Sequence, residues 1–177
     1  MRPPALPVPI LGERVALRPF RRADLPRVIG WRNDPEVRAG ALWPGGPFGA
    51  REAERWLRAI STGHNRVTLG VELRHEARLV GLTNLSGING GAASAHFGIV
   101  VGDKACWGRG IARETLGLMM ERAAAMGLRR VVLEVARDNG RALALYEHFG
   151  FTTDRHVTRH HEGGLVELTI MSLRLPR

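Results

Sequence analysis

The feature that most constrains the fold is a change of hydrophobic period around a glycine-rich turn. A short apolar run at residues 99–101 is followed, after five residues, by Trp-Gly-Arg-Gly at residues 107–110. Beyond this turn, apolar side chains recur at alternating four- and three-residue spacing, which is the period of one helical stripe. They are Ala112, Leu116, Met119, Ala123 and Met126. The sequence therefore predicts a strand, a glycine turn and a helix in succession.

The glycine turn indicates a site for an anion. Gly108 and Gly110 lack a Cβ, so the backbone there can turn sharply and approach a ligand closely. The first amides of the following helix have no intrahelical partner and bind phosphate oxygens well. Arg109 and Arg113 add positive charge at the same place. The turn fits neither a P-loop, because it lacks the Lys-Ser/Thr pair, nor the dinucleotide-binding fingerprint.

A second strand and helix follow the first unit. Residues 130–136 are typical of a buried strand, and residues 138–151 predict a helix that Gly150 closes. Four residues share the inner face of this helix, namely Ala142, Leu145, Tyr146 and Phe149.

Together these units resemble the signatures of the GNAT superfamily of acyl-CoA-dependent N-acetyltransferases, within it the RimJ/RimL-like branch. The phosphate turn of that family, Gln/Arg-x-x-Gly-x-Gly/Ala, is matched by Gly110 and Ala112, with Trp107 at the leading position as is frequent in this branch. The second signature, Asn-x-x-Ala-x-x-Leu-Tyr-x-x-x-Gly-Phe, is matched at Asn139, Ala142, Leu145, Tyr146, Gly150 and Phe151. A looser match over residues 17–19, 24–25 and 31–37 extends the resemblance over most of the chain.

The order of the predicted elements indicates a mixed α/β fold with helices on both faces of the sheet. Strands are expected at residues 14–20, 66–73, 78–86, 94–101 and 130–136, with a final hairpin of residues 152–158 and 165–175. Asp24 is expected to cap a short helix, residues 50–61 a second one, and Pro35 with residues 43–47 predicts an irregular loop. The resemblance implies a largely antiparallel sheet of about seven strands that splays between the fourth and fifth.

Length and composition favour one domain. The chain has 177 residues, 44% of them hydrophobic, which suits a single core over residues 1–177 with a proline-rich arm at residues 1–10. The arm does not resemble a signal peptide and no stretch is long enough to span a bilayer, so a cytoplasmic protein is expected. Cys106 is the only cysteine, which excludes an intramolecular disulfide. No metal site is expected, since His160, His161 and Glu162 are typical of a solvated hairpin tip.

The formal charge of +9 raises the alternative of nucleic-acid binding. The basic residues are almost all arginine, however, and they are spread along the chain without a run or interleaved aromatic residues. RNA binding is therefore the minority hypothesis, and part of the charge can serve an anionic cofactor.

The resemblance implies acetyl-CoA as the co-substrate. The pantetheine arm would pair with Ile99, Val100 and Val101 as an added strand, and an amide near Ile99 would polarise the thioester carbonyl. The remaining cofactor-binding positions implied are Trp107, Gly108, Arg109, Gly110, Ile111, Ala112, Arg113, Asn139 and Ala142.

The resemblance also implies that Tyr146 is the general acid, with its hydroxyl near the cofactor sulfur. For the base there are two candidates, His96 in place of the Glu that many relatives carry and Glu134 on the neighbouring strand; loss of the amine proton to solvent is the third option. The acceptor wall is expected to include Trp31, Asn33, Trp43 and Phe48, although the helical spacing of Trp31 is more typical of a core residue.

The sequence thus predicts an N-acetyltransferase that acts on a primary amine, either a protein N-terminus, including that of a ribosomal protein, or a small molecule such as an aminoglycoside or a polyamine. A non-catalytic module that senses acyl-CoA or binds the ribosome or RNA is the alternative of a different class. The edge of the last hairpin is a place where a homodimer could form.

Overall fold

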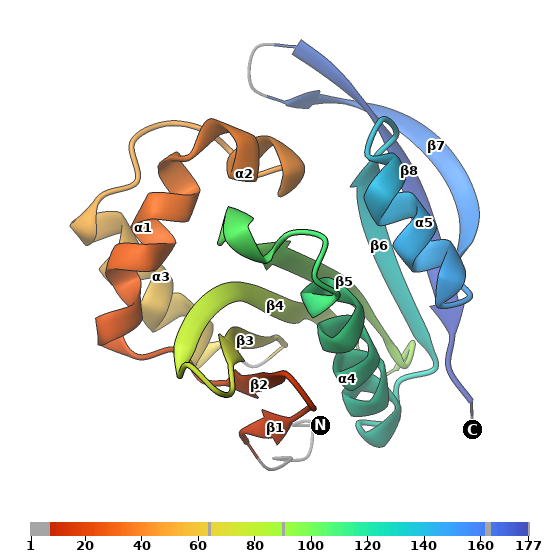
Figure 1. Ribbon diagram of the computed structural model, residues 1–177. Helices are drawn as coiled ribbons and strands as arrows, with labels where there is room; N and C mark the ends of the chain where they lie inside the picture. Colours follow the sequence, from red (N-terminus) through yellow and green to blue (C-terminus); the bar gives the residue numbers. More distant parts are fainter. Residues whose placement is uncertain (1–7, 64, 90, 162–163, 177) are drawn as a thin grey trace.

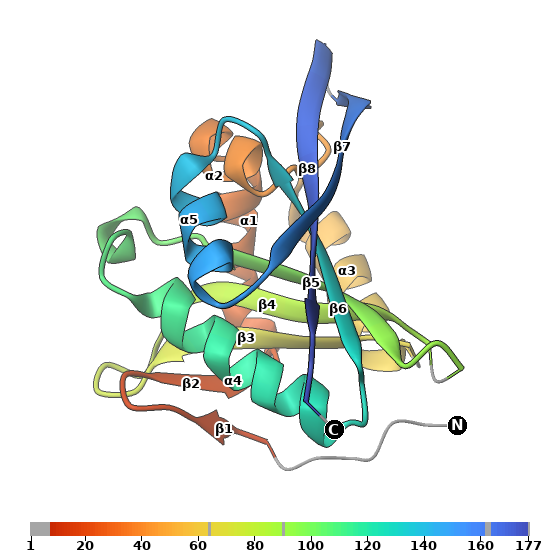
Figure 2. The same ribbon diagram turned by 90° about the vertical axis from the view of Figure 1, so that its right-hand side faces the viewer.

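One twisted sheet forms the frame of the protein (Figures 1 and 2). The computed structural model describes residues 8–63, 65–89, 91–161 and 164–176, and within them eight strands are ordered β1-β2-β3-β4-β5-β6-β8-β7. The strands are β1 (Ile10–Leu11), β2 (Val15–Arg18), β3 (Val67–Leu73), β4 (Arg78–Asn89), β5 (Ser94–Val101), β6 (Arg130–Ala136), β7 (Thr152–His161) and β8 (Gly164–Arg174). The expected strands are confirmed, and β1 is added because the N-terminal segment pairs with β2.

Helices cover both faces of this sheet, as the pattern predicted. They are α1 (Leu25–Asn33), α2 (Pro35–Gly40), α3 (Ala50–Thr62), α4 (Ile111–Ala125) and α5 (Gly140–His148), with short 3-10 turns at Arg22–Asp24 and Lys104–Cys106. Figures 1 and 2 show α4 and α5 on one face, and α1 and α3 on the other. The mixed α/β class is therefore confirmed.

The sheet opens between β5 and β6, the one neighbouring pair that runs parallel among the described strands. Their register is limited to Ser94, Ala95 and His96 opposite residues 130–132, although β5 continues to Val101. The edge of β5 beyond His96 is therefore not covered by β6. This is the splay that was expected between the fourth and fifth strands, shifted by one in number because of β1.

The helical stripe predicted after the glycine turn packs against the sheet. Leu116, Met119 and Ala123 are fully buried in the main core, and the two ends of the stripe are half-buried. Because α4 is anchored along its length, its first turn is held at the opening between β5 and β6.

The irregular loop expected after Pro35 begins later than predicted. Residues 35–40 form the short helix α2, because Pro35 occupies its first turn and Asp34 caps it. The Asp34 Oδ1 atom accepts hydrogen bonds from the amides of Glu36 and Val37, at 3.0 and 3.1 Å. The prediction was therefore wrong for this segment.

Asp24 does not cap α1 through its side chain, contrary to the sequence-based expectation. Its carboxylate instead accepts two hydrogen bonds from the Arg18 guanidinium, at 2.8 and 2.9 Å, and both side chains are buried. Burial by itself raises the Asp24 pKa, but the hydrogen bonds from Arg18 and the Arg21 amide outweigh it and hold the pKa below the ordinary value. A buried guanidinium six residues away thus competes successfully for the capping carboxylate.

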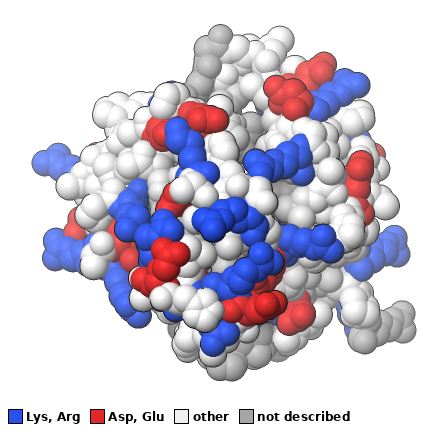
Figure 3. All heavy atoms as spheres, viewed as in Figure 1, with Lys and Arg blue, Asp and Glu red and all other residues white. Residues whose placement is uncertain are grey.

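Charge is distributed rather than gathered on the face seen in Figure 3, where Lys and Arg side chains alternate with Asp and Glu. Among the described residues, no helix is both long and apolar enough to cross a membrane. The arm at residues 1–7 and Glu162 of the hairpin lie outside the described residues.

Candidate active site

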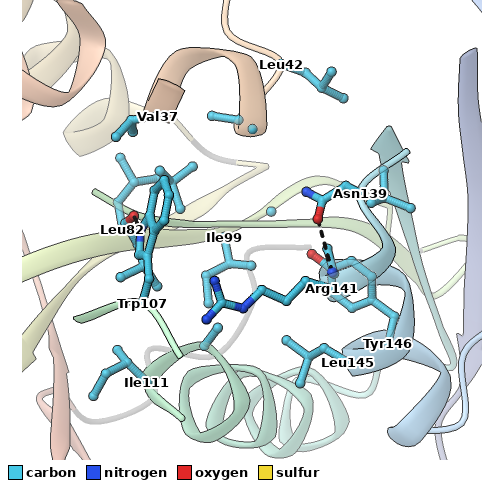
Figure 4. Close-up of a pocket in the computed structure, with 18 of the residues that line it drawn as sticks. Val37, Leu42, Leu82, Ile99, Trp107, Ile111, Asn139, Arg141, Leu145 and Tyr146 are labelled. Atoms are coloured by element: carbon cyan, nitrogen blue, oxygen red, sulfur yellow. Dashed lines mark hydrogen bonds between the residues drawn. The ribbon is translucent and has the colours of Figure 1, made fainter. Parts of the chain in front are cut away.

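A pocket of about 460 Å³ lies where β5 and β6 part (Figure 4). Gly98–Val101 line it from β5 and Glu134 and Val135 line it from β6, so its walls are the two separated strands. The turn before α4, side chains along α5 as far as Tyr146 and the segment 36–43 complete the enclosure. The elements predicted to carry the chemistry therefore meet in one cavity.

The glycine turn has the backbone conformation that only glycine adopts without strain. Gly108 and Gly110 have φ angles of +76° and +78°. The Trp107 indole donates a hydrogen bond to the Val101 carbonyl at 2.7 Å, which ties the turn to β5. On the other side, Arg14 Nη1 donates to the Arg109 carbonyl at 2.9 Å. The turn is therefore fixed with its free amides at the head of α4, a geometry suited to phosphate oxygens.

Two arginines line the pocket beside this turn, Arg113 and Arg141, whereas Arg109 does not. Arg113 lies against His148, with 2.5 Å between Nη2 and Nε2. Arg141 extends from α5 toward the turn (Figure 4). The sequence interpretation missed Arg141, although it stands inside the Asn139–Ala142 signature, because the signature does not specify that position.

Tyr146 lies deep in the pocket. Its side chain is buried, and the centre of its ring lies 6.5 Å from the ring centre of Phe97 and 5.8 Å from that of Phe151. Within the described residues its hydroxyl has no hydrogen-bond partner. Burial raises the pKa of Tyr146 to about 12, so the phenol keeps its proton at neutral pH.

Asn139 both caps α5 and lines the pocket. Its Oδ1 atom accepts a hydrogen bond from the Ala142 amide at 3.1 Å, which caps α5 (Figure 4). Its side-chain nitrogen makes no hydrogen bond to any described residue, and both Asn139 and Ala142 line the pocket. The cap fixes the amide group at the pocket wall.

The two predicted bases are placed differently. Glu134 lines the pocket, and its carboxylate pairs with Arg159 at 2.8 Å. His96 is exposed and does not line the pocket, because it lies in the stretch of β5 that still pairs with β6. Glu134 therefore lies at the opening between the two strands, whereas His96 lies in the part of the sheet where the strands are still paired.

Of the four residues expected to contact the acceptor, Trp43 lines the pocket and the others do not. Trp31 is buried in a second hydrophobic cluster. Asn33 exchanges hydrogen bonds with the backbone of Phe48, donating at 2.8 Å and accepting at 3.3 Å. Trp31 and Asn33 therefore lie outside the pocket, in contacts that stabilise the fold.

Cys106 also borders the pocket, but its thiol is buried. Burial raises the pKa of this thiol, which keeps it neutral and poorly nucleophilic at neutral pH. No cluster of three or more potential metal ligands occurs among the described residues.

Comparisons with known proteins identify the family to which the chain belongs. The model of the acetyltransferase (GNAT) domain family matches residues 14–152, more than half of the chain. An uncharacterised protein of Methanocaldococcus jannaschii is 26% identical over 145 residues, which cover 80% of this chain and 29% of that protein. The chain thus spans under a third of the length of this relative.

Solved structures share the fold. Spermidine N-acetyltransferase from Vibrio cholerae, in complex with CoA and spermine, superposes with a TM-score of 0.82 at 23% identity, covering 92% of this chain and 96% of that one. A GNAT-family acetyltransferase from Bacillus anthracis gives a TM-score of 0.81 at 18% identity, covering 93% and 97%. With the family match, the strand opening and the glycine turn at the head of α4, the chain belongs to the GNAT family of acetyltransferases.

Proposed function

We propose that the protein transfers an acetyl group from acetyl-CoA directly to a primary amine while both substrates are bound. The observation that carries this is a single pocket that joins the glycine turn to the Tyr146 hydroxyl along the uncovered edge of β5. Proximity of two bound substrates can itself supply much of the acceleration of such a reaction.

The residues present fit acetyl-CoA. The amides at the head of α4 would bind the pyrophosphate, with Arg113 and Arg141 supplying positive charge. Residues 99–101 would pair with the pantetheine arm as a further strand, since β6 does not cover this edge. The amide near Ile99 would polarise the thioester carbonyl, and Asn139 would hold the arm or a water molecule.

Two side chains would move protons. The amine attacks the thioester carbon, the bond from carbon to sulfur breaks, and Tyr146 donates a proton to the departing sulfur. Glu134 would accept the proton that the amine loses, directly or through water, and Arg159 holds its carboxylate at the opening. Because Glu134 lines the pocket and His96 does not, we assign the base to Glu134.

The test is thiol release from acetyl-CoA with a panel of primary amines. Turnover that falls sharply in Tyr146→Phe and in Glu134→Gln, but not in His96→Gln, supports the proposal. Tight CoA binding with no turnover on any amine would instead indicate a module that only senses acyl-CoA, and salt-dependent RNA retention without CoA affinity would indicate an RNA-binding protein.

We also propose that residues 1–177 form one domain of the RimJ/RimL-like branch, acting in the cytoplasm on a peptide N-terminus, such as that of a ribosomal protein, or on a small amine. The Trp-Gly-x-Gly turn supports the branch. The strand β7 ends the sheet and offers an edge for a homodimer. Light scattering coupled to gel filtration tests the dimer, and acetylation of N-terminal peptides tests the branch.

A further inference from the structure

A second cavity of about 130 Å³ lies beside the main pocket, on the face of the sheet covered by α1 and α3. It shares Trp43, Leu82 and Asn84 with the main pocket, so the two cavities adjoin at these three residues. Its remaining lining is Val28, Arg32, Trp56, Ile60, Arg66, Thr68 and Ser86. Two guanidinium groups and no carboxylate face this space.

Arg32 is held by aromatic rings rather than by an acid. Its guanidinium carbon lies 4.8 Å from the centre of the Trp43 ring and 4.6 Å from that of Phe48. Rings over the faces of a guanidinium leave its in-plane N–H groups available for a planar acceptor such as a carboxylate. Within the described residues Arg32 has no ion pair, and burial lowers its pKa.

Arg66 is likewise without an ion pair among the described residues, whereas both carboxylates that line the main pocket have a cationic partner. Glu134 pairs with Arg159 at 2.8 Å, and Glu36 shares Lys104, at 3.2 Å, with Asp34, which lies 2.8 Å from the same ammonium group. The second cavity is therefore positively charged, since its two arginines have no ion pair among the described residues and no carboxylate lines it. A polycation would be repelled there, and an anionic group would be attracted.

We propose that the acceptor is a primary amine that also carries a carboxylate, which Arg32 and Arg66 bind in the second cavity. Thr68, Ser86 and Asn84 supply further polar groups around the carboxylate. With the carboxylate held there, the amine extends past Trp43 and Asn84 toward Glu134 in the main pocket. This assignment rests on the proposed function and narrows its substrate class.

Matched acceptor pairs test the assignment. Initial rates are measured for β-alanine against β-alanine amide, for peptides with Glu against Gln at the second position, and for spermidine. The carboxylate member of at least one pair is expected to have a kcat/KM at least about tenfold higher than its amide. The pair that shows the preference tells whether the carboxylate comes from a small amino acid or from a peptide. Equal rates within both pairs, or a preference for spermidine, overturn the proposal.

Arginine variants test whether Arg32 and Arg66 cause the preference for the carboxylate acceptor. Arg32→Gln and Arg66→Gln are expected to remove it while leaving the Kd for CoA within about twofold, since neither arginine lines the main pocket. Arg27→Gln is the matched control, since Arg27 lies exposed on the same helix as Arg32 and lines neither cavity. If Arg32→Gln fails to fold, the more exposed Arg66 carries the test. A preference that persists in the folded variants contradicts the assignment.

Binding of succinate separates this inference from the proposed function, because it needs no turnover. Succinate should quench tryptophan fluorescence, since Trp43 and Trp56 line the cavity. Its dissociation constant should rise about tenfold or more in Arg66→Gln and stay unchanged in Arg27→Gln. This result supports the anion site even if no amine is acetylated. Failure of succinate to bind the wild-type protein overturns the site even if amines are acetylated.

Discussion

The guanidinium of Arg141 on α5 lies directly over Gly108 in the turn before α4. A Cβ atom built on this glycine would come within 2.7 Å of Arg141 Nη2. The turn and α5, which are separated in sequence by α4 and β6, thus bring a cation and free amides to the same place, an arrangement suited to a pyrophosphate.

Replacing Arg141 by Gln should weaken acetyl-CoA binding by about 1.5 kcal/mol, roughly tenfold in Kd, because one charge-assisted contact is lost. Isothermal titration with CoA measures this. Arg137→Gln is the control, because Arg137 is exposed, pairs with Glu167 and does not line the pocket. Equal losses in the two variants would show only a general charge effect.

Gly108→Ala should raise KM for acetyl-CoA at least about tenfold, since the new methyl group displaces Arg141 and strains the turn. The φ angle of +76° alone costs about 1 kcal/mol in an alanine. Gly127→Ala isolates that cost, because Gly127 has φ +78° and open space around its missing Cβ. If both variants lose stability but neither changes KM, the turn does not bind the cofactor.

Tyr146→Phe should lower kcat by about 100-fold, because the departing sulfur loses its proton donor. The Kd for CoA should change little, since the ring and its contacts with Phe97 and Phe151 are kept. Steady-state rates and titrations on the same preparation measure the two effects. An unchanged kcat would exclude Tyr146 as the acid.

The pH dependence should reflect the buried environment of Tyr146. An ordinary tyrosine ionises near pH 10, whereas burial raises the pKa of this one to about 12. The hydroxyl therefore keeps its proton, and kcat should not decline up to about pH 10 on account of this group. A descending limb near pH 10 that disappears in Tyr146→Phe would contradict this placement.

Asp24→Asn should destabilise the protein by about 3 kcal/mol at neutral pH, because it leaves the buried Arg18 guanidinium without its main partner. The folded Asp24 pKa lies below its unfolded value near 3.9, so its contribution is present above about pH 4 and is lost as the pH falls further. Urea unfolding at neutral and acidic pH measures both. Glu54→Gln is the control, since its partner Arg22 is exposed, and it should cost under about 1 kcal/mol.

Local patterns in the sequence were sufficient for most of the fold. The four- and three-residue spacing from Leu116 to Ala123 reflects a property of neighbouring residues, so the helix and its buried face were predicted correctly. The prediction at Pro35 was wrong because proline both disrupts helices and begins them. Only the hydrogen bonds that Asp34 accepts from the amides of Glu36 and Val37 show that a helix begins here.

The site depends on contacts between distant segments, which the sequence does not display. Arg141 becomes a pocket residue only because α5 packs beside the turn of α4. His96 and Glu134 are equivalent as candidates until the point where β5 and β6 part is known. The aromatic enclosure of Arg32 needs Phe48, which lies beyond a loop whose path no local pattern fixes.

Within the described strands, β5 and β6 are paired over only three residues, Ser94–His96, and so the two halves of the sheet meet along a short seam. A small bend at that seam changes the distance between the strands most at their open end. We therefore expect these three pairs to affect both the entry of substrates and the separation at which two bound reactants are held. A substitution there could slow the enzyme without touching any group that takes part in the chemistry.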